Sequence, residues 1–143
     1  MEAIGPAVVL ATAFVWLGMV LAISFLETPL KFRAPGVTLH SGLAIGRIVF
    51  RALNTVELVL ALVLLALLAW TPGGAPTVLV IVLLALVALQ VGLVRPLLNR
   101  RSDRVLAGEQ PPRSRAHLVY VGFEIVKVGL LAAAGITTLV AIT

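Results

Sequence analysis

The sequence predicts an all-α protein that crosses a membrane as a four-helix bundle in up-down-up-down order. Of its 143 residues, 61% are hydrophobic and only 12% are charged, and the mean hydropathy is +1.15. A soluble domain of this length would carry a much more polar surface. Four apolar stretches each approach the roughly 20 residues that cross a bilayer, and no alternating β-barrel pattern occurs. We therefore predict a single integral membrane domain over residues 1–143.

The first span is expected over residues 4–27. It lacks the basic start of a signal peptide, because Glu2 is the only charged residue before Glu27, and its apolar run exceeds an ordinary signal-peptide core. We therefore expect it to be retained as a helix. Pro35-Gly36 then suits a tight turn, and Thr38 can cap the next helix.

The remaining spans are expected over residues 46–70, 76–95 and 116–142. The second helix can begin as early as Leu39. The short linker "TPGGAP" that follows it makes its neighbours antiparallel. Beyond the third span, Pro96 can kink the helix into an extension that stops near Gly108. The extension is either a membrane-surface segment or a solvated basic loop.

The net charge of +5 comes from basic residues in and beside two loops. The first set is Lys31, Arg33, Arg47 and Arg51, and the second is Arg95, Arg100, Arg101, Arg104, Arg113 and Arg115. The second loop and both termini have no basic residue. The positive-inside rule therefore predicts that loops one and three are cytoplasmic and both termini outside, as in a bacterial inner (plasma) membrane. The expected partners are anionic lipid headgroups, and no nucleic acid.

A polar stripe enters the second span in the stretch "GRIVFRALNTVELVLALVLL". Its members are Arg47, Arg51, Asn54 and Glu57. At about 100° per residue these four side chains share one third of the helix circumference. The arginines can snorkel to the membrane surface, but Glu57 lies too deep, where an unpaired ionisable group costs at least about 2.5 kcal/mol. This side of the helix is therefore expected to face protein.

The fourth span offers partners on a stripe of its own, formed by His117, Tyr120, Glu124 and Lys127. Because both helices enter from the same side, we expect an inward-facing polar cluster in the cytoplasmic half of the bundle. Its leading pairs are Glu57–Lys127 and Arg51–Glu124. The candidate site residues are Glu27, Arg47, Arg51, Asn54, Glu57, His117, Tyr120, Glu124 and Lys127, with Gln90 or Arg95 completing the ring.

Two roles for this cluster stay open. It can bind a ligand, since ionisable residues inside membranes usually mark functional sites. It can instead fix helix register, because hydrogen bonds there are often worth only about 0.6 kcal/mol. No metal or cofactor is expected, because the acids and bases balance each other, the chain has no cysteine, and it lacks a paired Glu-x-x-His motif, a nucleophile elbow and a P-loop.

The segment "RIVFRALNTVE" resembles the signature of the membrane-associated proteins of eicosanoid and glutathione metabolism (MAPEG). That family has an arginine, an asparagine seven residues later and a glutamate three further on, matched here by Arg47, Asn54 and Glu57. The resemblance implies four helices, trimers, glutathione binding on the cytoplasmic side, and conjugation or peroxidase chemistry. The chain departs from the family pattern in four ways. Gly46 replaces its glutamate, and the second arginine comes one residue late, at Arg51. The proline that usually follows the glutamate is missing, and so is the arginine-tyrosine pattern late in the third helix and its loop.

A second resemblance covers more of the chain. "WLGMVLAISFLETPLKFRAP", "GRIVF" and "RPLLNRRSDRVLAGEQPPRSRAHLVYVGFEIVKVG" are similar to small bacterial four-helix membrane proteins, which in turn resemble the human transmembrane protein associated with cisplatin resistance. This likeness implies a four-helix membrane protein without an assigned activity. The hypotheses are an accessory subunit or binder of a small ligand or lipid, a glutathione- or lipid-metabolising enzyme, and a small transporter. Each is compatible with a homo-oligomer or a larger membrane complex.

Overall fold

The protein is an integral membrane protein with an all-α architecture. The computed structural model describes residues 4–70, 75–110 and 115–143. Four helical spans in these ranges are long and apolar enough to cross a membrane: Ile4–Lys31, Leu39–Ala69, Thr77–Leu106 and His117–Ile142. The described ranges contain no β-strand. The predicted fold class is therefore confirmed.

The spans divide into shorter elements. The first comprises α1 (Ile4–Val20), the π-helix η1 (Leu21–Glu27) and α2 (Thr28–Lys31); the second is α3 (Leu39–Trp70); the third comprises α4 (Ala75–Leu89), the π-helix η2 (Gln90–Val94) and α5 (Arg95–Leu106); the fourth is α6 (Arg115–Ile142). The first three spans are longer at the basic-residue end than predicted: the first and third end later, and the second begins earlier. In each case the chain stays helical through the polar turns next to the apolar run.

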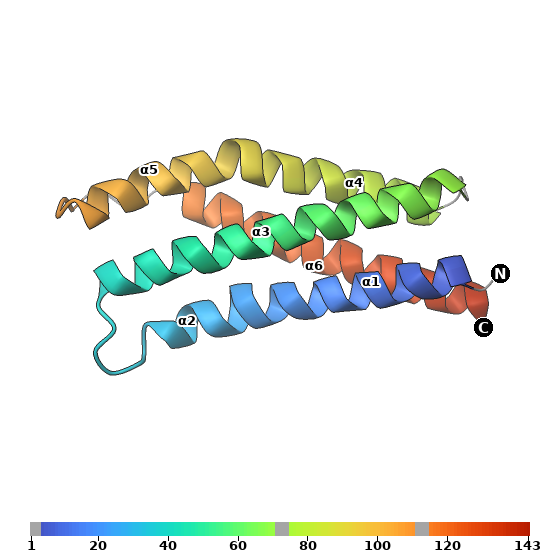
Figure 1. Ribbon diagram of the computed structural model, residues 1–143, viewed down its shortest axis with the longest axis horizontal. Coiled ribbons are helices and arrows are strands. Elements are labelled where there is room, and N and C mark those ends of the chain that lie inside the picture. The colour runs from blue at the N-terminus through green and yellow to red at the C-terminus, as the bar shows by residue number, and fades with distance from the viewer. Residues whose placement is uncertain (1–3, 71–74, 111–114) are drawn as a thin grey trace.

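The bundle is closed by contacts of α1 with α3 and α6, and of α4 with the same two helices. Both termini lie at one end of the bundle, and the loop after α2 lies with α5 at the other (Figure 1). Neighbouring spans therefore alternate in direction, as the short linkers predict. We refer to the second end, formed by residues 32–38 and α5, as the basic end.

Each π-helix comes shortly before a proline. η1 precedes Pro29, and η2 precedes Pro96. Proline lacks an N–H, and its ring crowds the carbonyl four residues earlier, so a wider turn at this point relieves the conflict. At η1, the backbone N–H and the hydroxyl of Thr28 both donate to the Ile23 carbonyl. The chain continues as helix past both prolines, and the extension after Pro96 is α5 rather than an irregular loop.

The predicted start and stop signals act as expected. Thr38 and Ser41 form a reciprocal cap at the start of α3, in which each hydroxyl accepts the other residue's backbone N–H, at 2.9 and 3.1 Å. Gly108 has a φ of +88° directly after α5. The N–H of Gly108 donates to the Val105 carbonyl, and that of Glu109 to the Arg104 carbonyl. This pattern is a Schellman motif, which favours glycine because of the positive φ.

The interior changes character along the bundle. Apolar side chains fill the half nearer the termini, among them Val9, Leu68 and Leu83. Thr138 is a buried polar residue there, and its hydroxyl donates to the Ala134 carbonyl of its own helix. Among the described residues, those with buried charged or amide side chains lie near the midpoints of the spans or closer to the basic end. The polar interior therefore extends from the middle of the bundle toward the basic end.

Candidate functional site

An ion-pair network joins α3 and α6 near the middle of the bundle. The Lys127 Nζ atom lies 2.6 Å from Glu57 Oε1 and 2.5 Å from Glu124 Oε1. All three side chains are almost fully buried. The structure thus contains the predicted Glu57–Lys127 pair, and the network lies at the middle of the spans, slightly deeper than expected.

Neutral donors from the other two spans add to this network. The Trp16 indole donates to Glu57 Oε1 at 2.9 Å. Glu124 accepts from the Gln90 amide at 2.5 Å and from the Ser24 hydroxyl at 2.6 Å. Because buried charges need partners, these bonds stabilise the two carboxylates that share one ammonium. We call this set the charge cluster: Trp16, Ser24, Glu57, Gln90, Glu124 and Lys127.

The predicted Arg51–Glu124 pair is wrong. Glu124 already accepts from three donors, and Arg51 is an exposed residue that lines a groove between α3 and α5. The stripe from Arg51 to Glu57 covers about 120° of α3, which is too wide for both residues to face the bundle axis. Arg47, one turn earlier, pairs instead with Asp103 of α5.

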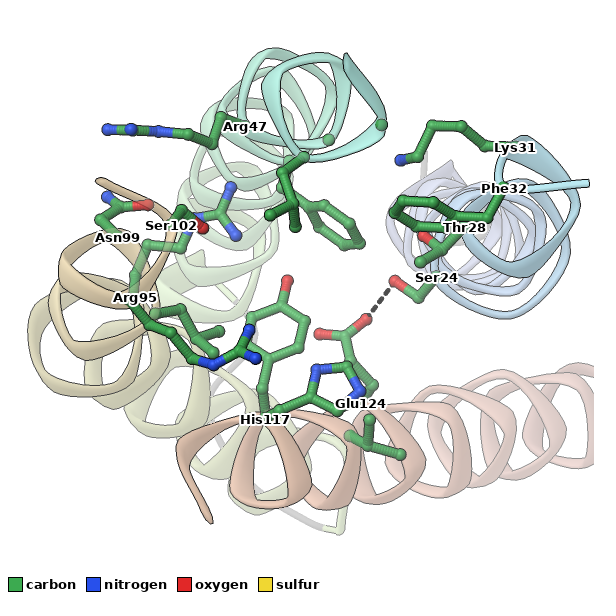
Figure 2. A pocket seen from close by; sticks show the side chains of 18 of the residues that line it. Ser24, Thr28, Lys31, Phe32, Arg47, Arg95, Asn99, Ser102, His117 and Glu124 are labelled. Atoms are coloured by element: carbon green, nitrogen blue, oxygen red, sulfur yellow. Dashed lines mark hydrogen bonds between the residues drawn. The ribbon is translucent and has the colours of Figure 1, made fainter. Parts of the chain in front are cut away.

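A cavity of about 180 Å³ connects the charge cluster with the basic end. Its apolar walls include the rings of Phe25, Phe32 and Phe50, and Glu124 marks its deep end. Figure 2 shows Lys31 and Arg95 reaching toward the cavity from opposite walls, and the bond between Ser24 and Glu124. The polar lining comprises Ser24, Thr28, Lys31, Arg47, Arg95, Asn99, Arg101, Ser102, His117, Tyr120 and Glu124.

Two cations of this cavity have no carboxylate at hydrogen-bond distance, although Lys31 forms a long ion pair with Glu27. The Lys31 side chain is only 6% exposed, yet its nearest carboxylate, that of Glu27, lies 3.6 Å away, beyond a good hydrogen bond. The Arg95 guanidinium lies 5.1 Å from the centre of the Phe50 ring and 5.9 Å from that of Tyr120. Within the described part of the chain Arg95 has these cation–π contacts and no ion pair.

The Tyr120 hydroxyl adds a neutral group to the same wall. It is buried, and it has no hydrogen-bond partner among the described residues. The Tyr120 ring packs edge-on against Phe50, with 5.5 Å between centroids, which fixes its orientation. The cavity thus offers a guest two cations, one free hydroxyl and aromatic walls.

The predicted site residues divide among three places. Glu57, Glu124 and Lys127 belong to the charge cluster; Arg47, Tyr120 and His117 line the cavity, with Glu27 beside Lys31; Arg51 and Asn54 line the groove, as does Arg47. The candidate set omitted Trp16, Ser24 and Lys31. An indole N–H deep in an apolar span needs an acceptor, and this signal pointed to Trp16. Ser24 carried no such signal.

The acidic residues do not gather as a metal site. Among the residues that the structure describes, no three His, Asp or Glu side chains lie close enough together to hold an ion. The two carboxylates that approach each other, those of Glu57 and Glu124, do so around the Lys127 ammonium. The arrangement therefore supplies fixed charges and hydrogen-bond donors.

Comparisons of the chain with family models, with curated proteins and with solved structures found no match.

Proposed function

We propose that the protein is a non-enzymatic binding protein of the membrane, which takes a small anion with an apolar part into the cavity. The observation that supports this proposal is the pair of half-buried cations, Lys31 and Arg95, neither of which has a carboxylate at hydrogen-bond distance. A carboxylate or phosphate between them would form charge-assisted hydrogen bonds, with Tyr120 as a further donor. The aromatic walls suit the apolar part of such a molecule.

The cavity entrance is proposed to face the cytoplasm. Arg33, Arg100 and Arg104 are exposed at the basic end, whereas the opposite end has no described basic residue. This asymmetry follows the positive-inside rule. The ligand would then come from the cytoplasm or from the inner leaflet.

The cavity size favours a small ligand. Sites for drug-sized molecules have volumes of about 300–1,000 Å³, and this cavity has about 180 Å³. That volume suits a short-chain carboxylate or an organic phosphate better than a tripeptide such as glutathione. Of the three residues that carry the MAPEG resemblance, only Arg47 lines the cavity, whereas Asn54 lines the groove and Glu57 pairs with Lys127. These points favour the binding protein over the glutathione enzyme.

The apolar half of the bundle favours binding over transport. Between the charge cluster and the terminal end, the interior contains packed side chains such as Leu64, Leu83 and Leu131. An ion that left the cavity in this direction would lose its polar partners in a low-dielectric interior. A single bundle therefore supports entry and exit at the basic end.

The proposal can be tested with a probe pair of equal length and opposite charge, hexanoate and hexylammonium, added to the purified protein in detergent. Thermal unfolding and calorimetry should show binding of hexanoate and none of hexylammonium. Lys31→Leu and Arg95→Leu should each abolish the response to hexanoate. Arg33→Gln, which removes an exposed charge outside the cavity, should retain it.

Two results would overturn the proposal: equal responses to both probes, or hexanoate binding that survives both cavity variants. Glutathione is titrated in parallel, and binding that disappears in Arg51→Ala would favour the MAPEG-like enzyme. Native mass spectrometry of the same preparation reports the oligomer size, and co-purification of a larger complex would favour the accessory subunit.

A further inference from the structure

A groove between α3 and the η2–α5 segment lies away from the bundle axis. Its volume is about 500 Å³. It shares Arg47, Arg95 and Asn99 with the cavity, whereas Arg51 and Asn54 line the groove alone. The proposed cavity ligand needs neither of these two residues, so the groove requires its own explanation.

Both walls of the groove carry cationic or amide side chains followed by apolar ones toward the middle of the bundle. On α3, the lining passes from Arg51 through Asn54 to Leu58, over roughly 10 Å of helix rise. On the opposite wall it passes from Asn99 through Arg95 to Val91. Each wall is therefore apolar toward the middle of the bundle, whereas nearer the basic end its arginines and asparagines lie among the apolar residues Ala44, Ile48 and Leu106.

Asn54 gives an independent sign that a polar guest is missing. This residue is only 6% exposed, it lines the groove, and its Oδ1 atom has no hydrogen-bond partner among the described residues. A buried amide oxygen without a donor costs free energy, since it has lost its hydrogen bonds to water and gained none in the protein. The neighbouring Thr55 does not satisfy it, because its hydroxyl donates to the Arg51 carbonyl at 2.8 Å.

We propose that the groove binds one anionic phospholipid from the leaflet at the basic end. The phosphate lies between Arg51 and Arg95, the hydroxyl-bearing headgroup and ester region contact Asn54, and an acyl chain follows Leu58 and Val91. From Arg51 and Asn99 inward, the headgroup-to-chain order of a phospholipid matches the change from polar to apolar lining. Charge also selects the occupant, because three arginines line the groove and Arg47 alone has a carboxylate partner among the described residues.

The test compares lipid retention in native mass spectrometry. The protein is purified in detergent micelles that contain equal amounts of phosphatidylglycerol and phosphatidylcholine, and the bound lipid is counted after partial delipidation. Wild-type protein should retain phosphatidylglycerol selectively. Arg51→Gln should lower its retention about fivefold, as expected for one arginine near an anionic lipid. Arg100→Gln is the matched control, because Arg100 of α5 is exposed, as Arg51 of α3 is, but does not line the groove.

Three results would overturn the proposal. Equal retention of the two lipids would remove the role of charge, and equal losses in Arg51→Gln and Arg100→Gln would remove the groove. Glycerol 3-phosphate or inorganic phosphate that displaces phosphatidylglycerol at similar concentration would show a site for free phosphate instead. Asn54→Leu, which keeps the side-chain volume, provides a second variant that should weaken retention.

The two proposed sites share Arg95, but each has a cation of its own, Lys31 in the cavity and Arg51 in the groove. Lys31→Leu should abolish hexanoate binding and leave phosphatidylglycerol retention unchanged, because Lys31 lines the cavity only. Arg51→Gln should lower phosphatidylglycerol retention and leave hexanoate binding unchanged, because Arg51 lines the groove only. The two variants therefore distinguish the failure of either site from the failure of both.

Discussion

Replacing Lys127 with methionine removes the one ammonium that lies between two buried carboxylates. Lys127 contacts Glu57 at 2.6 Å and Glu124 at 2.5 Å, and all three are inside the bundle. Removing one partner of a buried ion pair typically lowers the free energy of unfolding by about 3–5 kcal/mol. We expect a loss of about this size for Lys127→Met. Glu57→Gln should lower the free energy of unfolding less, by about 1.5–3 kcal/mol, because the positive charge of Lys127 is still balanced by the negative charge of Glu124.

The double variant separates ion pairing from simple packing. If the two effects were independent, Glu57→Gln with Lys127→Met would cost about 4.5–8 kcal/mol, the sum of the single costs. We expect it to cost no more than Lys127→Met alone, since Glu57→Gln removes one of the two carboxylates that the first change leaves unpaired. The remaining Glu124 keeps its bonds from Gln90 and Ser24.

The assay is reversible unfolding in mixed micelles, followed by far-ultraviolet circular dichroism for the wild type, both single variants and the double variant. The expected coupling energy is about 2 kcal/mol or more, well above the 0.6 kcal/mol of an average hydrogen bond between membrane helices. A coupling energy at or below about 0.6 kcal/mol would refute our interpretation and reduce the cluster to packing. A double variant that is less stable than Lys127→Met would refute it as well.

Three further predictions concern the surroundings of the cluster. Trp16→Phe keeps an aromatic ring but removes the N–H that donates to Glu57. The free energy of unfolding in the same assay should therefore fall by about 1.5–3 kcal/mol. Gly42→Ala should weaken hexanoate binding in calorimetry, because the new Cβ would lie 2.2 Å from the Phe32 ring, which lines the cavity; Gly122→Ala, with no atom within 4 Å, should not. Glu124→Gln should lower the Kd for hexanoate severalfold, because it removes the only carboxylate that lines the cavity in the described residues.

The sequence predicted the scaffold because bilayer thickness restricts it so strongly. Apolar length located the four spans, and Thr38 and Gly108 marked a helix start and a helix stop that the structure contains. The Glu57–Lys127 pair followed from two helical stripes that enter from the same side. These inferences use only helix periodicity and the cost of burying a charge, so they need no knowledge of packing.

The parts that could not be predicted depend on how the helices rotate against one another. Two stripes do not specify which flank faces the bundle axis, so Arg51 was assigned to Glu124 although it turns toward the α3–α5 groove. Lys31 was interpreted as a loop residue because the first span was expected to end at residue 27. Its place in the cavity follows from one additional helical turn, which composition alone does not reveal.

The π-helices explain why Ser24 escaped sequence reasoning. Trp16 and Ser24 are eight residues apart, which places them about 80° apart around a regular α-helix. η1 begins between them, and each residue of a π-helix turns through a smaller angle because its hydrogen bonds enclose more residues per turn. Ser24 is thereby rotated back toward the face of Trp16, where it reaches Glu124. Since the wider turns accompany Pro29 and Pro96, these two prolines are part of the sequence information that builds the charge cluster.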